Sequence, residues 1–135
     1  MRRILLVDGD SINRDYLLCL LEPFGTCRAA HDGHEALALI REALGLGEPF
    51  DAAVLGPALS DPDGPDLARQ ADELQDQAGI PGGDRTRVIL MVPPDAAPDQ
   101  AALDANAVHA AIPAPGTRRR FMEAFSALNL LSSLP

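Results

Sequence analysis

The chain has 135 residues and a formal net charge of −9, from 11 basic and 20 acidic residues. Its length is typical of one domain. The composition, with 47% hydrophobic and 23% charged residues, is typical of a globular chain that buries a core. The acidic balance disfavours nonspecific nucleic-acid binding, and no apolar run is long enough to span a bilayer. The first apolar run meets Asp8 too early for a signal peptide. We therefore predict one cytoplasmic domain, residues 1–135, that binds neither nucleic acid nor membrane.

Two features of the composition limit the chemistry. Cys19 and Cys27 match no metal-binding or redox spacing, and two thiols do not make a disulfide framework. Every basic residue is an arginine, so no mechanism in this domain can use a lysine. The spacing of the three histidines, His31, His34 and His109, matches no metal-binding motif. We predict neither a metal nor another cofactor.

Short apolar runs alternate with helical patterns along the chain. The run 4–7 is apolar throughout and ends at the acidic segment 8–10, which is typical of a parallel strand buried on both faces. Ser11 is a suitable N-cap for the helix that follows, and Pro23 ends that helix. Later strands are predicted, in chain order, at 26–30, 50–55, 88–92 and 108–112. Later helices are predicted at 34–44, 65–77, 98–105 and 118–128, the last with Thr117 as its N-cap.

This alternation predicts an α/β fold with a parallel sheet and helices on both faces. Right-handed crossovers then favour a flavodoxin-like, doubly wound sheet of five strands in the order 2-1-3-4-5, with five helices. Ligands of such folds bind beyond the carboxyl ends of the strands, between strands one and three. In this chain, the segments 8–10, 56–57 and 92–93 frame that place.

Several segments of this sequence resemble the receiver domain of two-component response regulators, and together they span nearly the whole chain. The similar segments are, in chain order, 4–14, 30–37, 50–56, 63–67 and Ala114-Pro115. The resemblance implies phosphorylation of an aspartate by a phosphohistidine, assisted by Mg²⁺. In that family two acids after the first strand and the acceptor aspartate hold the metal. A threonine or serine and a lysine bind the phosphoryl oxygens.

The positions that carry this chemistry are mostly altered here. Asp8 keeps the first acid, whereas Gly9 stands at the second, with Asp10 beside it. The other three positions have lost their functional side chains: Gly56 stands at the acceptor, Val92 at the hydroxyl and Ala114 at the lysine. Glycine supplies no nucleophile, and Mg²⁺ needs several oxygen ligands. The pocket is therefore predicted to be vestigial, and the protein is predicted not to be an enzyme.

The resemblance, together with the loss of the family's functional side chains, predicts a degenerate receiver domain in bacterial phosphorelay signalling. It would act through protein–protein contact without being phosphorylated. One alternative is phosphorylation of a surrogate acid, with Asp10, Asp61 and Asp63 as candidates. Another alternative is a small-ligand or metal sensor that uses the acidic crevice.

Two segments suggest an interaction surface. Residues 16–21 are six apolar residues in a row, which cannot all face one sheet, so Tyr16 or Leu18 is expected on the outside. Cations are disfavoured at a helix N-terminus, yet the last helix is predicted to begin with Arg118, Arg119 and Arg120. The expected partner is a histidine kinase, another signalling protein or a second copy of this chain.

Overall fold

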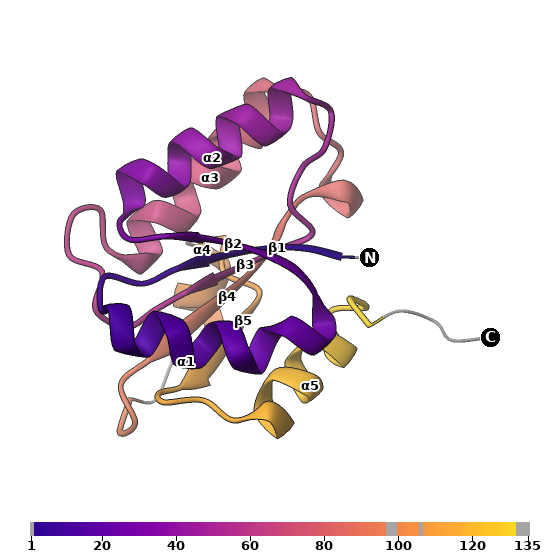
Figure 1. The fold of residues 1–135 in the computed structure, drawn as a ribbon. Coiled ribbons are helices and arrows are strands. Elements are labelled where there is room, and N and C mark those ends of the chain that lie inside the picture. The colour runs from indigo at the N-terminus through magenta and orange to yellow at the C-terminus, as the bar shows by residue number, and fades with distance from the viewer. Residues whose placement is uncertain (1, 97–99, 106, 132–135) are drawn as a thin grey trace.

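The computed structural model describes residues 2–96, 100–105 and 107–131, and within them five parallel strands form one sheet (Figure 1). The strand order is β2-β1-β3-β4-β5, as predicted. The strands are β1 (Arg2–Val7), β2 (Gly25–Ala30), β3 (Ala52–Leu55), β4 (Arg87–Val92) and β5 (Ala110–Pro113). This architecture confirms the predicted flavodoxin-like fold class.

Helices connect the strands and cover both faces of the sheet. The α-helices are α1 (Ser11–Leu21), α2 (Gly33–Gly45), α3 (Gly64–Gln77), α4 (Gln100–Ala105) and α5 (Arg118–Ala127). Two 3₁₀ turns, η1 (Glu22–Phe24) and η2 (Gly82–Asp84), complete the described elements. None of the described helices is long and apolar enough to cross a membrane.

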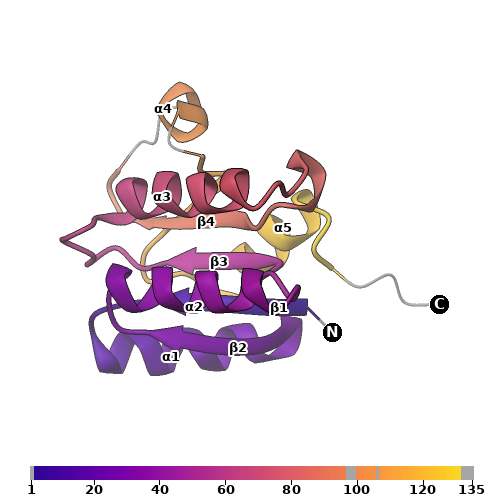
Figure 2. The same ribbon diagram turned by 90° about the horizontal axis from the view of Figure 1, so that it is seen from above.

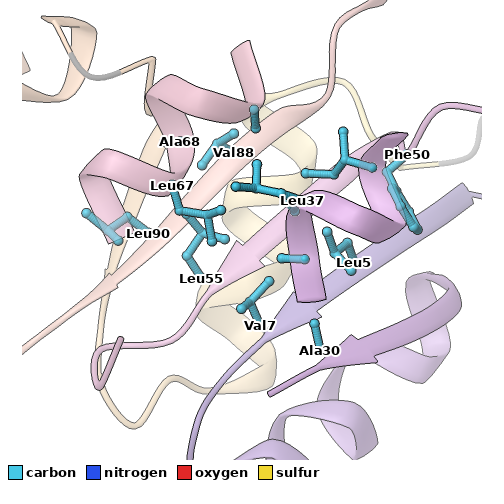
Figure 3. Close-up of a cluster of buried hydrophobic side chains, with 14 of the residues drawn as sticks. Leu5, Val7, Ala30, Leu37, Phe50, Leu55, Leu67, Ala68, Val88 and Leu90 are labelled. Atoms are coloured by element: carbon cyan, nitrogen blue, oxygen red, sulfur yellow. The ribbon is translucent and has the colours of Figure 1, made fainter. Parts of the chain in front are cut away.

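The sheet is buried between two layers of helices, α2 and α3 on one face and α1 and α5 on the other (Figure 1). Figure 2 shows the same layers from the side of α2 and α3. Alternate residues of β1 face opposite sides: Leu5 belongs to the hydrophobic cluster under α2 and α3, and Leu6 to the cluster under α1 and α5. Figure 3 shows the first cluster, in which Leu37 of α2 and Leu67 of α3 lie above the strands. Burial on both faces explains why the strands of this sequence are continuously apolar.

The structure differs from the sequence predictions at element boundaries. Asp10, not Ser11, is the N-cap of α1, because its carboxylate accepts hydrogen bonds from the backbone N–H groups of Ile12 and Asn13. Strand β3 begins at Ala52 rather than residue 50, and β5 begins at Ala110 rather than residue 108. The predicted helix 98–105 is described from residue 100, and its first two residues lie outside the described part of the chain.

Candidate functional site

Asp8 lies at the end of β1 and is completely buried. Its Oδ1 accepts a hydrogen bond from the backbone N–H of Asp10 at 2.8 Å, and its Oδ2 accepts one from the side-chain amide of Asn13. The Arg14 guanidinium donates to the Asp8 carbonyl oxygen at 2.9 Å. Both carboxylate oxygens are therefore engaged in holding the first turn of α1 against the end of β1.

Gly56 follows β3 and faces the Asp8 side chain. Its backbone N–H donates to the carbonyl of Val7 at 2.7 Å, which brings the ends of β1 and β3 together. A Cβ atom at position 56 would lie 2.2 Å from Asp8 Oδ2 and 2.7 Å from Asp8 Cγ. The Asp8 carboxylate thus occupies the place where a side chain at position 56 would begin.

Gly9 differs from Gly56 in this respect. A Cβ at position 9 would have the His31 carbonyl oxygen at 3.5 Å as its nearest neighbour, which is an ordinary van der Waals contact. A side chain is therefore sterically possible at position 9 and sterically excluded at position 56 unless Asp8 moves.

A pocket of about 720 Å³ opens at this carboxyl edge of the sheet, between the start of α1 and the loops after β3, β4 and β5. Its polar lining comes from Asp8, Asp10 and Asn13. The rest of its lining is apolar and consists of Ile12, Tyr16, Pro57, Ala58, Pro94, Ala114 and Pro115. Ala114 is part of this apolar wall, at the position where the resemblance implies a lysine.

The structure brings together only part of the predicted pocket. Asp8, Asp10 and Ala114 line it, whereas Gly56 is not part of the lining and lies against the Asp8 side chain. Val92 does not line it, because its side chain packs against the hydrophobic cluster on the α2 and α3 side of the sheet. Ile12 and Asn13 also line this pocket, and the sequence predictions did not single out either side chain. The two prolines that line it, Pro94 and Pro115, follow the predicted fourth strand and Ala114, so their positions in the sequence indicated this edge of the sheet.

The candidate surrogate acids are distributed around this edge. Asp10 caps α1, and Asp63 caps α3 by accepting a hydrogen bond from the Asp66 backbone N–H at 2.9 Å. Asp61 is exposed and borders a separate, smaller pocket beside Gly9. Two of the three candidate acids, Asp10 and Asp63, therefore stabilise helix N-termini as N-caps. Within the described residues, no group of three or more His, Cys, Asp or Glu side chains is placed to hold a metal ion.

The predicted interaction residues lie on the face formed by α1 and α5. Tyr16 is 42% exposed, and its hydroxyl donates to the Gly116 carbonyl at 3.0 Å. Leu18 is only partly buried and packs against the cluster under these two helices, so it is less available than Tyr16. The three arginines that open α5 are all exposed, namely Arg118, Arg119 and Arg120.

Comparison with known proteins relates this fold to receiver domains. The chain is 24% identical to a response regulator receiver domain protein (CheY-like) from Methanospirillum hungatei JF-1, with a TM-score of 0.74, covering 96% of this chain and 94% of that one. It is 18% identical to the chemotaxis protein CheY4 of Vibrio cholerae, with a TM-score of 0.75 and coverage of 95% and 98%. No protein-family model and no curated protein matches the sequence.

A third similar structure is the receiver domain of the histidine kinase CKI1 from Arabidopsis thaliana, complexed with Mg²⁺ and BeF₃⁻. It is 20% identical, with a TM-score of 0.74, and the match covers 96% of this chain and 89% of that one. These similarities show the fold: the chain has the fold of CheY-like receiver domains over nearly its whole length.

Proposed function

We propose that this protein is a degenerate receiver domain of a two-component signalling system, which acts through protein contact and does not accept a phosphoryl group. Receiver-like structures match almost the entire chain, which supports the first half of the proposal. A fold persists when the site on it is lost, so the second half depends on the site alone.

One observation carries the second half of the proposal: the position of the acceptor is Gly56, and the Asp8 carboxylate fills the space of the missing side chain. Both oxygens of Asp8, the remaining acid that would hold Mg²⁺ in a receiver, also accept hydrogen bonds from within the protein. Transfer of a phosphoryl group also needs fixed positive or donor groups around its oxygens. Ala114 and the prolines of the pocket supply none.

The geometry also favours protein contact over small-ligand or metal sensing. The pocket is open, and most of its lining is apolar, with an isoleucine and a tyrosine exposed at its rim. Exposed apolar patches mark protein-interaction sites or ligand-binding grooves, and the 81% exposure of Ile12 at the rim supports the first of these. An enzyme is not proposed, because no nucleophile paired with a base lies in the pocket.

Incubation with acetyl phosphate and Mg²⁺, followed by intact-protein mass spectrometry, tests this proposal. A receiver that carries the acceptor aspartate is treated in parallel and should gain one phosphoryl group. We expect no mass increase for this protein. A phosphoryl adduct would overturn the proposal, and its position would identify whether Asp10, Asp61 or Asp63 acts as a surrogate.

A further inference from the structure

An exposed isoleucine stands at the rim of the apolar pocket. Ile12 is in the first turn of α1 and is 81% exposed, the largest exposure of any large apolar side chain in the described chain. It lines the pocket together with Tyr16, Pro94 and Pro115. One face of the molecule therefore presents a protruding apolar side chain directly beside an apolar hollow.

The charges around this hollow have both signs and are separated. Two exposed acids belong to this region, Asp15 within α1 and Glu22 directly after it. The exposed arginines are at the start of α5, where only Arg119 forms an ion pair, with Glu123, among the described residues. In the described part of the chain, neither Arg118 nor Arg120 has a carboxylate partner, although the chain carries a net charge of −9.

The acidic and basic regions lie next to each other. Figure 1 shows α1 and α5 side by side, and Figure 2 places both behind the sheet. The hydrogen bond from the Tyr16 hydroxyl to the Gly116 carbonyl joins the middle of α1 to the segment just before Arg118. A surface with an adjacent projection and hollow, and with adjacent acidic and basic regions, is complementary to a copy of itself turned by a two-fold rotation.

We propose that this surface, formed by the exposed sides of α1, the start of α5 and the apolar pocket, is the interface of a two-fold homodimer. In the dimer, Ile12 of each copy enters the pocket of the other. Arg118 and Arg120 of α5 then face Asp15 on α1 of the other copy. The inference rests on the proposed function, because a pocket that had to admit Mg²⁺ and a phosphoryl donor could not be closed in this way. Because the acidic and the basic region lie on the same surface, a second copy offers each region an opposite charge.

Sedimentation velocity over a range of concentrations tests the apolar part of the proposal. We expect the wild-type protein to form a dimer, and Ile12→Glu to sediment as a monomer at the concentrations where the wild type is dimeric. Leu46→Glu is the matched control, because Leu46 is 66% exposed at the end of α2, away from this surface. Circular dichroism confirms that both variants remain folded. A monomeric wild type, or equal weakening by the two variants, would overturn the proposal.

Charge exchange tests the two-fold arrangement. Asp15→Arg alone, and Arg118→Glu combined with Arg120→Glu, should each weaken the dimer at least tenfold, because like charges then meet across the interface. An equimolar mixture of the two variant proteins should regain dimers, since every acidic region then faces a basic region. If the mixture stays monomeric while both variants are folded, the two-fold contact between α1 and α5 is wrong.

These results are independent of the test of the proposed function. A protein that stays monomeric and takes up no phosphoryl group refutes the homodimer and leaves the degenerate receiver intact. A protein that is phosphorylated refutes the proposed function and removes the premise that the pocket is free to be closed, whatever its oligomeric state.

Discussion

The carboxylate of Asp8 and the missing side chain of Gly56 share one space. A Cβ at position 56 would lie 2.2 Å from Asp8 Oδ2, and the Gly56 N–H is bonded to the carbonyl that directly precedes Asp8. The two positions are therefore coupled: the buried conformation of Asp8 requires glycine opposite it. The glycine is needed for a close approach, since its φ angle is not in the left-handed region.

We first predict that Gly56→Ala destabilises the protein by about 1–3 kcal/mol, the usual cost of overpacking a close contact. The added methyl group must displace a carboxylate that is held by two hydrogen bonds. Gly9→Ala is the matched control and should change the free energy of unfolding by less than about 0.5 kcal/mol, as is usual for exposed positions. Urea denaturation of both variants measures the difference, and equal destabilisation would contradict the steric account.

The second prediction concerns the coupling between the two positions. Asp8→Ala should cost about 1–3 kcal/mol, because the Asp10 N–H and the Asn13 amide lose their acceptor. It also removes the atoms that a Cβ at position 56 would meet. In the Asp8→Ala background, Gly56→Ala should therefore cost clearly less than it does alone. Denaturation of the two single variants and the double variant forms the cycle, and simple additivity would show that the two side chains do not compete for space.

Our third prediction is that Gly56→Asp does not restore phosphorylation. The variant supplies a carboxylate, but Asp8 blocks its ordinary position, and Gly9 and Ala114 still lack the acid and the cation that receivers use. Loss of one preorganised charge-stabilising group typically lowers a rate by about 10²–10³. Intact-protein mass after treatment with acetyl phosphate and Mg²⁺ is the measurement. Phosphorylation of this variant at a rate like that of an ordinary receiver would show that the pocket keeps the missing functions.

The fourth prediction is a dependence of stability on pH that comes from His109. The ring Nδ1 of His109 accepts a hydrogen bond from the backbone N–H of Val88 at 2.9 Å, and the backbone N–H of His109 donates to the Val88 carbonyl at 2.8 Å. Partial burial of the ring, followed by the nearby positive charge of Arg87, lowers the pKa of His109 below its usual 6.5, while Asp72 and Asp104 oppose the shift. A protonated Nδ1 could not accept the hydrogen bond.

Because the pKa of His109 is lower in the folded state, the unfolded chain binds more protons just below pH 6.5. The contribution of His109 is constant above that pH, and stability falls as the pH decreases from about 6.5 towards the folded-state pKa. His109→Asn keeps an acceptor without a titrating ring, so its unfolding free energy should fall less over this interval. Urea denaturation at several pH values compares the two proteins, and parallel curves would contradict the role of His109.

The sequence by itself determined the fold class, because its strands are continuously apolar and alternate with helices of regular amphipathic spacing. Local chemistry was also readable: Thr117 caps α5 as predicted, with its hydroxyl accepting the Arg120 N–H. The N-cap of α1 was predicted one residue late, since Asp10 and Ser11 are both good capping residues and only the backbone conformation selects between them.

Only the tertiary structure decided what the altered pocket contains. The sequence shows an acid at position 8 and a glycine at position 56. It does not show that the carboxylate fills the space opposite the glycine, because that contact joins two strands far apart in the sequence. The exposure of Ile12 and the inward packing of Val92 were likewise not readable, since they depend on which neighbours the fold brings to each side chain. Side-chain periodicity reports which face of an element is buried, whereas the contents of a site depend on distances between elements.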